Sequence, residues 1–446
     1  MLARTTLLVF TLLNFANYVD RYVLPPVLES LKRDPAFLGV SDYQLGKLQT
    51  AFFLAYMVLS PIAGVAGRRV PRRYLVALGV GLWSAATVLS GLARSYDELF
   101  AARALIGAGE GGYATLAPAI LSDLFAPGRR SRVLALFYVA TPVGSALGMM
   151  LGGFFAQHYS WRAAFFVAGA PGLLLALIVL LLPEPRRGAM DGAASPAGNG
   201  DGALAAALPV TRVVDELKAL WGNRTWLRVT LSNTLIAFSI GGLAYWMPSY
   251  FQAARGLDAQ QASLVVGASA VVGGLLGTLA GGFLGDAWLK RDPAALLRVS
   301  GLGILVGAPI VLLLPLAPST VTCVALFLLA NFFLFFNTGP LNTALVESAP
   351  ASFREGAVGL HIFLIHLLGD AISPSLMGAL IGVLAGARVA ASSASLTTSS
   401  AATTSTESMA RGQALGAVIA LCVVPLAACA ASLLVGLPAR TPRPSK

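Results

Sequence analysis

Charged residues and cysteines are scarce in this chain, and each shortage excludes a class of protein. Only 11% of its 446 residues are charged and 57% are hydrophobic, whereas a soluble domain usually carries about 25% charged residues. This composition excludes an ordinary soluble protein and predicts an integral membrane protein with many spans. The three cysteines lie in apolar runs without metal-ligand spacing, so they predict packing residues and no metal site.

Enzyme motifs are also lacking. No Walker phosphate loop is present, so ATP does not drive this protein directly. The glycines between Gly107 and Gly112 lie inside a hydrophobic segment and do not follow a strand, which excludes a dinucleotide site. The sequence therefore predicts a protein that is not an enzyme and holds no cofactor. Its net charge of +11 reflects membrane topology and predicts no nucleic-acid partner.

Long hydrophobic segments are abundant, and we identify twelve. A helix of about 20 apolar residues crosses the roughly 30 Å hydrocarbon core of a bilayer. The sequence predicts an all-α membrane protein with twelve transmembrane helices in two six-helix bundles. The segments are 5–28, 42–66, 74–94, 97–121, 132–156, 161–183, 225–251, 260–286, 294–317, 319–346, 355–385 and 411–437.

Two polar stretches interrupt these segments. The stretch before the seventh segment is rich in Gly, Ala and Ser, and its end, 210–221, is amphipathic and predicts a helix on the membrane surface. The stretch 390–408 is rich in Ser, Thr and Ala and predicts a loop. The predicted domains are a first bundle at 1–183, a cytoplasmic linker at 184–224, a second bundle at 225–437 and a cytoplasmic tail at 438–446.

Lys and Arg set the predicted orientation. Most basic residues outside the spans lie on the side of the membrane that holds the N-terminus, and the positive side is cytoplasmic. Both termini and the linker are therefore predicted to be cytoplasmic, in a bacterial inner membrane. The first segment contains Asp20 and Arg21 and has no small-residue cleavage site, so we expect a first span and not a removed leader.

An internal repeat indicates that the two bundles are related. The loop after the second span and the loop after the eighth share two glycines and a terminal basic pair without a gap, as parallel repeats do. Both are predicted to be gating loops. Their residues are Gly64, Gly67, Arg68, Arg72 and Arg73 in the first copy, and Gly282, Gly285, Asp286, Lys290 and Arg291 in the second.

The two six-span halves, the long connector and the paired loops resemble the major facilitator superfamily. Within it, the N-terminal half resembles the Spinster family. The strings that carry this resemblance are Asn17–Tyr22, Leu48–Phe52, Arg103–Pro118, Asp123–Phe125 and Phe137–Ser145.

The resemblance implies a secondary transporter that works by alternating access. Animal Spinster proteins export sphingosine-1-phosphate or lysophospholipids, although a fold alone does not transfer a substrate. The chain departs from the superfamily at one position. Arg68 stands where the loop motif normally has Asp, whereas the second copy keeps Asp286. Since that Asp usually helps to lock the cytoplasmic side closed, we expect a weaker latch here.

Four ionisable residues fall within the spans of the first half. Charges at membrane depth are costly unless they face a partner or a water-filled cavity. Arg103 and Glu110 are seven residues apart, so they share one helix face about 10 Å apart. We expect Asp20 to be the principal proton-coupling residue, Glu110 the second, and Arg21 and Arg103 their charge partners. The alternative is a buried structural ion pair.

The second half has fewer ionisable candidates. His361, His366 and Asp370 form a possible polar site, in which His366 and Asp370 have the spacing of a helical pair. A polar patch between helices is the alternative. Other residues could line a substrate cavity, although such residues more often pack between helices: Tyr22, Tyr113, Trp246 and Asn337.

We therefore predict a monomeric, proton-coupled transporter of a lipid-like amphiphile such as a lysophospholipid. The charged first half would suit a charged head group, and the apolar second half would suit an acyl chain. Two alternatives remain open: a transporter of small organic anions or drugs, and a receptor or sensor on a transporter scaffold.

Overall fold

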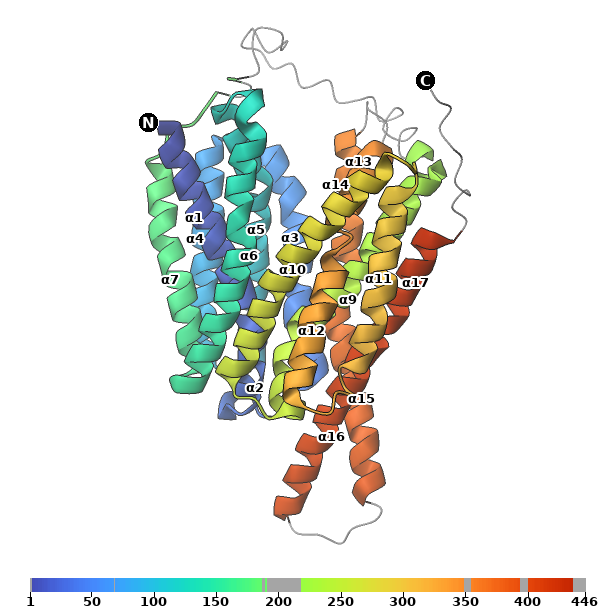
Figure 1. Cartoon of the computed structure of the whole chain (residues 1–446). Coiled ribbons are helices and arrows are strands. Elements are labelled where there is room, and N and C mark those ends of the chain that lie inside the picture. Colours follow the sequence, from blue (N-terminus) through green and yellow to red (C-terminus); the bar gives the residue numbers. More distant parts are fainter. Residues whose placement is uncertain are drawn as a thin grey trace. The chain divides into compact units, whose positions relative to one another are not determined.

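The computed structural model describes residues 2–67, 69–186, 189–190, 218–348, 354–393 and 400–435. Over these residues the chain is helical and contains no strand (Figure 1). It divides into two compact units. Unit 1 comprises residues 1–40, 47–209 and 258–267, and unit 2 comprises residues 41–46, 210–257 and 268–446. The predicted surface helix at 210–221 falls mostly outside the described residues.

Unit 1 is built mainly from the helices of the first half. Helix α4 packs against α5 and α7, and α1 packs against α6. Ser95 and Ser160 start α5 and α7 by accepting hydrogen bonds from the amides of Glu98 and Arg162, as N-cap residues do. The helices are α1 Leu2–Tyr22, α2 Leu24–Lys32, the 3₁₀ helix η1 Pro35–Phe37, α3 Asp42–Ala66, α4 Arg72–Leu92, α5 Tyr96–Leu124, α6 Pro127–His158 and α7 Trp161–Leu180.

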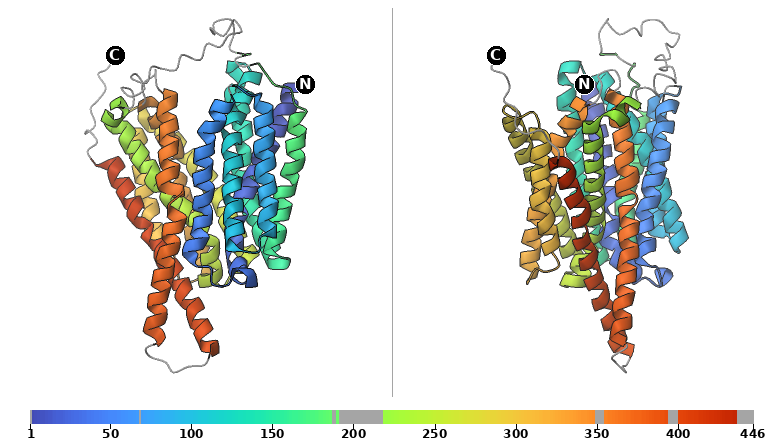
Figure 2. Two further views of the ribbon diagram at one scale, coloured as in Figure 1. Left: turned by 180° about the vertical axis from the view of Figure 1, so that it is seen from behind. Right: turned by 90° about the vertical axis from the view of Figure 1, so that its right-hand side faces the viewer.

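Unit 2 contains most of the remaining helices. Helix α9 packs against α16 and α17, α11 against α12 and α17, and α15 runs beside α16 (Figure 2). Asn223 caps the start of α9, and Gly256, with a φ of 69°, ends it. The helices are α9 Arg224–Arg255, α10 Ala259–Leu289, α11 Ala295–Leu313, α12 Thr320–Phe335, α13 Thr338–Ser348, α14 Arg354–Ile365, the π-helix η3 His366–Asp370, α15 Ser373–Ser393, α16 Ser400–Leu421 and α17 Val423–Leu434.

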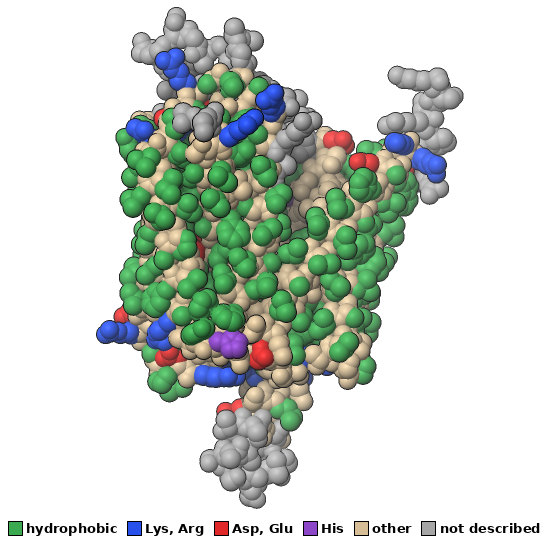
Figure 3. Space-filling view, turned by 60° about the vertical axis from the view of Figure 1, so that its left-hand side comes forward, with side chains coloured by type: hydrophobic (Ala, Val, Ile, Leu, Met, Phe, Trp, Pro, Cys, Tyr) green, Lys and Arg blue, Asp and Glu red, His purple; other side chains and the backbone are tan. Residues whose placement is uncertain are grey.

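Ten of the described helical segments are long and apolar enough to cross a membrane. The two predicted spans missing from this set are covered by α1 and α5, which carry the ionisable residues. On the face drawn in Figure 3, hydrophobic side chains cover the middle of the helices and charged side chains gather near their ends. The chain is therefore an integral membrane protein, and the number of twelve spans stays a prediction.

Three predicted boundaries are wrong. The segment 5–28 is two helices, because Pro25 has no amide proton and its ring would clash with the carbonyl of Arg21 in a continuous helix. The segment 355–385 contains the π-helix and continues to Ser393. The expected loop at 390–408 is largely helical, since α16 begins at Ser400; its alanines favour the helical state.

Candidate functional site

Helices α1 and α5 bring four ionisable residues of unit 1 together. Helix α1 supplies Asp20 and Arg21, and α5 supplies Arg103 and Glu110. Asp20 is 1% exposed, and Arg103 and Glu110 are 0% exposed. Burial of charged groups in apolar surroundings is costly. The partners of each residue therefore decide how far its charge is compensated.

Arg21 and Glu110 form a buried ion pair between α1 and α5. The Nε and Nη2 atoms of Arg21 donate to one carboxylate oxygen of Glu110 at 3.0 and 2.6 Å. The guanidinium carbon also lies 4.9, 5.0 and 5.4 Å from the ring centres of Tyr18, Phe52 and Tyr56, close enough for cation–π attraction. Arg21 therefore lies in an aromatic cage, and its positive charge compensates the negative charge of Glu110.

Asp20 lies next to Arg21 in sequence but does not share this arrangement. Adjacent helical residues point about 100° apart, and the Asp20 carboxylate lies near Glu110, Thr87, Arg103 and Trp83. Among the described residues, none donates a hydrogen bond of normal geometry to either of its buried carboxylate oxygens. An ionised carboxylate without such bonds is costly in apolar surroundings, so the neutral form of Asp20 is the less costly one at this position.

Arg103 reaches α3. Its Nη2 donates to Gln49 Oε1 at 3.1 Å, and its guanidinium carbon lies 5.1 Å from the Phe52 ring centre. Phe52 therefore contacts both Arg103 and Arg21. We did not predict Gln49 or Phe52 as partners of the charged residues, although both belong to the string Leu48–Phe52 that carries the family resemblance.

Glycines of α5 allow this close approach of α3. A Cβ atom on Gly107 would overlap the carbonyl of Phe52, and one on Gly111 would lie 2.5 Å from the carbonyl oxygen of Tyr56. Side chains at these positions would push α3 away. The glycine-rich string around Glu110 therefore helps to place the aromatic rings of α3 against Arg21.

The four candidate cavity residues lie in three different settings. Tyr22 is half-buried and stacks on Tyr18, with ring centres 6.5 Å apart. Tyr113 and Trp246 are buried and donate to the carbonyls of Phe10 and Pro374 at 3.0 Å each. Asn337 is buried and donates to the carbonyl of Leu334. The bonds of Tyr113 and Trp246 join separate helices, whereas that of Asn337 is local to the turn after α12.

His361 is the most buried of the second-half candidates. It is 2% exposed, and its two ring nitrogens lie 3.0 Å from Thr230 Oγ1 and 3.2 Å from Asn233 Nδ2. All three side chains belong to unit 2. The cluster joins α14 to α9 through neutral hydrogen-bonding partners.

His366 and Asp370 lie on the π-helix that follows α14. His366 Nδ1 is 2.8 Å from Asp370 Oδ2, and both side chains are partly buried. A Cβ atom on Gly241 of α9 would lie 2.6 Å from Asp370 Oδ1. The structure therefore places this pair against α9. π-helical turns occur often at functional sites.

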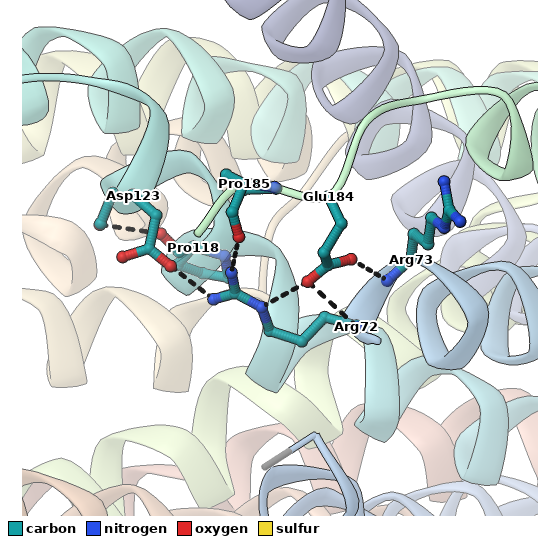
Figure 4. Close-up of polar contacts among 7 residues, drawn as sticks. Arg72, Arg73, Pro118, Asp123, Glu184 and Pro185 are labelled. Atoms are coloured by element: carbon teal, nitrogen blue, oxygen red, sulfur yellow. Dashed lines mark hydrogen bonds and ion pairs between the residues drawn. The ribbon is translucent and has the colours of Figure 1, made fainter. Parts of the chain in front are cut away.

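The first loop motif makes a charge cluster at the start of α4 (Figure 4). Arg72 is 5% exposed and contacts Asp123 Oδ2 at 2.6 Å and Glu184 Oε1 at 3.1 Å. Glu184 also accepts from the amides of Arg72 and Arg73 at 3.2 and 2.9 Å, which supplies the cap that Pro71 cannot provide. We did not predict Asp123 or Glu184 as partners of this loop.

The second loop motif is arranged differently. Asp286, Lys290 and Arg291 are exposed, and the buried glycine of this copy, Gly285, faces Pro340. In the first copy, Gly64 faces Thr115 and Gly67 faces Leu116. Arg68 lies outside the described residues, so the predicted weakening of the latch stays a prediction.

Known proteins resemble this chain in sequence over most of its length. The family model described as Major Facilitator Superfamily matches residues 10–374. Protein spinster of Drosophila melanogaster is 34% identical over 385 residues, which cover 84% of this chain and 61% of that protein. Protein spinster homolog 3 of Danio rerio is 34% identical over 388 residues, which cover 82% of this chain and 74% of that protein. The chain thus spans about three fifths of the Drosophila relative.

Solved structures share the fold. A bacterial homolog of the human lysosomal transporter Spinster, solved in an inward-facing and unoccupied conformation, matches with a TM-score of 0.82 and 23% identity over 97% of this chain and 96% of that chain. A D-xylose–proton symporter matches with a TM-score of 0.70 and 16% identity over 96% of this chain and 97% of that chain. The family model and the relatives show that the chain belongs to the major facilitator superfamily of transporters and, within it, to the Spinster family.

Proposed function

We propose that this protein is a proton-coupled secondary transporter of a lipid-like amphiphile, with Asp20 as the principal proton-coupling residue. The observation that carries the proposal is the contrast between two carboxylates of one site. Glu110 is neutralised by Arg21 at 2.6 Å, whereas Asp20 is buried and accepts no hydrogen bond of normal geometry from the described residues.

This contrast supports one proton per cycle at Asp20. An ionised Asp20 needs water or a cationic partner, while a protonated Asp20 can remain in the apolar interior. A conformational change that opened this position to water, or moved Arg103 toward it, would therefore favour release of the proton. Protonation and conformation would then be linked, because each state of Asp20 stabilises a different arrangement of the helices.

Glu110 is the second carboxylate of the proposal. Loss of its ion pair would leave either Arg21 or Glu110 charged in apolar surroundings. A substrate with its own charged group could replace one partner at low cost. The side chain of Arg21 is 13% exposed and that of Glu110 is 1% exposed. Arg21 is therefore the member closer to solvent and the better candidate to bind an anionic head group.

The division of polar groups between the units supports an amphiphilic substrate. Unit 1 buries Asp20, Arg103 and Glu110 at 0–1% exposure. The buried carboxylates of unit 2, Asp42 and Asp292, are each paired with an arginine, and its cluster around His361 is built from neutral partners. The Spinster relatives favour the same substrate class, and the named proton symporter with this fold supports proton coupling. We place the protein in a bacterial inner membrane as a monomer. The distribution of Lys and Arg indicates that both termini lie in the cytoplasm.

Transport into proteoliposomes tests this function. Labelled lysophosphatidylcholine and lysophosphatidylglycerol are offered with and without a pH gradient, and an internal pH dye records proton movement. Wild-type protein should accumulate a lysolipid and move protons together. Asp20→Asn keeps the size of the side chain but removes its titration, so gradient-driven transport should fall to the rate of protein-free liposomes while lysolipid binding remains.

The matched control is Asp97→Asn, which removes an exposed carboxylate at the start of α5 and should transport at the wild-type rate. Wild-type pH dependence in Asp20→Asn would make Asp20 a structural residue. Transport of small organic anions with no lysolipid movement would overturn the substrate class, and binding without any flux would favour a receptor.

A further inference from the structure

We propose that unit 2 carries a separate binding pocket for an anionic phospholipid at the C-terminal end of α9. A cavity of about 570 Å³ opens between the ends of α9, α11, α15 and α16. Its lining combines two arginines with a mostly apolar wall. The residues that matter most are Arg255, Arg388, Leu312, Leu316, Met409 and Ala417.

Arg255 is held rigidly at one side of the cavity. Its Nε donates to the Tyr250 hydroxyl at 3.0 Å, its Nη1 to the carbonyl of Ala317 at 2.9 Å, and its Nη2 to the carbonyls of Leu314 and Pro315 at 2.7 and 3.3 Å. A guanidinium has five N–H groups, so one on Nη1 remains for a ligand. Carbonyl and hydroxyl oxygens orient the guanidinium but do not neutralise its charge.

Arg388 brings a second positive charge to the same cavity. Its Nη1 donates to Gln413 Oε1 at 3.3 Å. Among the described residues, no carboxylate forms an ion pair with Arg255 or with Arg388. The only acidic residue described on α16 is the exposed Glu407. The cavity therefore holds two cationic groups without an internal counter-ion.

Arg411, also on α16, shows what a neutralised arginine looks like in this unit. It donates to both carboxylate oxygens of Asp42, with contacts of 2.8 and 3.0 Å. Arg411 does not line the cavity. The two arginines that lack such a partner are the ones that face the cavity, which points to an external anion.

The apolar part of the lining selects among anions. Leu312, Leu316 and Met409 are 42%, 71% and 67% exposed, and the small residues Gly416 and Ala417 also line the cavity. Inorganic phosphate would leave most of this wall uncovered, whereas pockets of roughly 300–1,000 Å³ accommodate ligands with substantial apolar surface. A phosphodiester with acyl chains satisfies both the arginines and the wall.

The position along the helix agrees with a lipid head group. Helix α9 has 32 residues, so its length is about 48 Å at 1.5 Å per residue, longer than the roughly 30 Å hydrocarbon core. Arg255 is its last residue. The end of α9 therefore reaches the level at which lipid phosphates lie.

Native mass spectrometry of the full chain tests the pocket. The protein is delipidated and titrated separately with phosphatidylglycerol, phosphatidylcholine and inorganic phosphate. Wild-type protein should retain phosphatidylglycerol in preference to the other two. The double variant Arg255→Gln/Arg388→Gln should bind phosphatidylglycerol about tenfold more weakly or worse, since hydrogen bonds to charged groups contribute about 1.5–3 kcal/mol.

Two further variants keep the test sound if loss of Arg255 disturbs the chain at 314–317. Arg388→Gln leaves every hydrogen bond of Arg255 in place, and Ala417→Phe fills the cavity without changing charge; both should weaken retention of phosphatidylglycerol. The matched control is Arg224→Gln, which removes the same charge from the exposed first turn of α9 and should bind like wild type.

Equal retention of phosphatidylcholine and phosphatidylglycerol would overturn the role of the arginines. Retention of inorganic phosphate without the lipid would assign a free-anion site and overturn the lipid proposal. Wild-type binding by both Arg388→Gln and Ala417→Phe would show that phosphatidylglycerol binds elsewhere.

Discussion

Unit 1 and unit 2 handle buried polarity in different ways. Unit 1 buries Asp20, Arg103 and Glu110 almost completely and pairs Arg21 with Glu110. Unit 2 pairs its buried carboxylates Asp42 and Asp292 with arginines, and its buried His361 relies on Thr230 and Asn233. A neutral hydrogen bond keeps helices together at modest cost, whereas a buried charge stores a large electrostatic free energy that protonation can release. The difference is that unit 1 buries a carboxylate, Asp20, that accepts no hydrogen bond of normal geometry from the described residues, and the proposed proton coupling rests on it.

The largest expected effect is loss of one partner from the Arg21–Glu110 pair. Arg21→Gln should lower the free energy of unfolding by about 3–5 kcal/mol, because it leaves Glu110 buried and uncompensated. The double variant Arg21→Gln/Glu110→Gln should recover much of this loss, since no unpaired charge remains. Thermal unfolding in detergent, followed for both variants, measures the difference. A double variant less stable than Arg21→Gln would refute the pairing.

The next largest effect is a difference in stability between variants of the two copies of the loop motif. Arg72→Gln removes contacts to both Asp123 and Glu184 and should cost about 2–3 kcal/mol, as charged hydrogen bonds do. Arg291→Gln in the second copy changes an exposed residue and should stay within about 0.5 kcal/mol of wild type. Similar losses in the two variants, measured by thermal unfolding, would remove the distinction between the copies.

A smaller effect is expected at the neutral cluster of unit 2. His361→Gln should destabilise the protein by about 1–2 kcal/mol, because two hydrogen bonds to α9 are lost or rearranged. The number of protons moved per substrate should not change. Dye-recorded proton movement divided by lysolipid uptake measures this ratio. A fall in the ratio would assign proton coupling to unit 2 as well.

The smallest effect is expected at the rim of unit 1, where Asp34 accepts hydrogen bonds from Arg162 and Trp161. Partial burial opposes ionisation, but the hydrogen bonds from Arg162, the Ala36 amide and Trp161 outweigh it and lower the pKa of Asp34. Its contribution to stability is therefore present above the unfolded-state pKa of about 3.9 and is lost as the pH falls through the lower folded-state pKa. The two side chains are partly exposed, 16% for Asp34 and 28% for Arg162, so solvent screening limits the contribution to at most about 1 kcal/mol.

Asp34→Asn tests this assignment. The wild-type protein should lose slightly more thermal stability than the variant between about pH 5 and pH 2, on either side of the unmodified carboxyl pKa. Asp97→Asn serves as the control, because its carboxylate is exposed. Parallel stability curves for wild type and Asp34→Asn would show that this rim pair carries no linked proton.

The sequence by itself determined the membrane class, most helical segments, the repeated loop and the family. These follow from local quantities: the hydropathy of about 20 consecutive residues, the scarcity of charge, and motif strings such as Arg103–Pro118. It also selected Asp20, Arg21, Arg103 and Glu110, because charges inside apolar segments are rare whatever the packing. Pro25 indicates the helix break after Tyr22, but hydropathy alone predicts one continuous segment.

Only the tertiary structure decided which of these residues meet. Arg21 pairs with Glu110, 89 positions away, and Asp20 turns to α4, because helix rotation and the close approach of α3 at Gly107 set the directions of side chains. The same holds for Glu184, which completes the Arg72 cluster from 112 positions away, and for the cavity at Arg255. Such contacts depend on several helices at once, and the period of one helix cannot specify them.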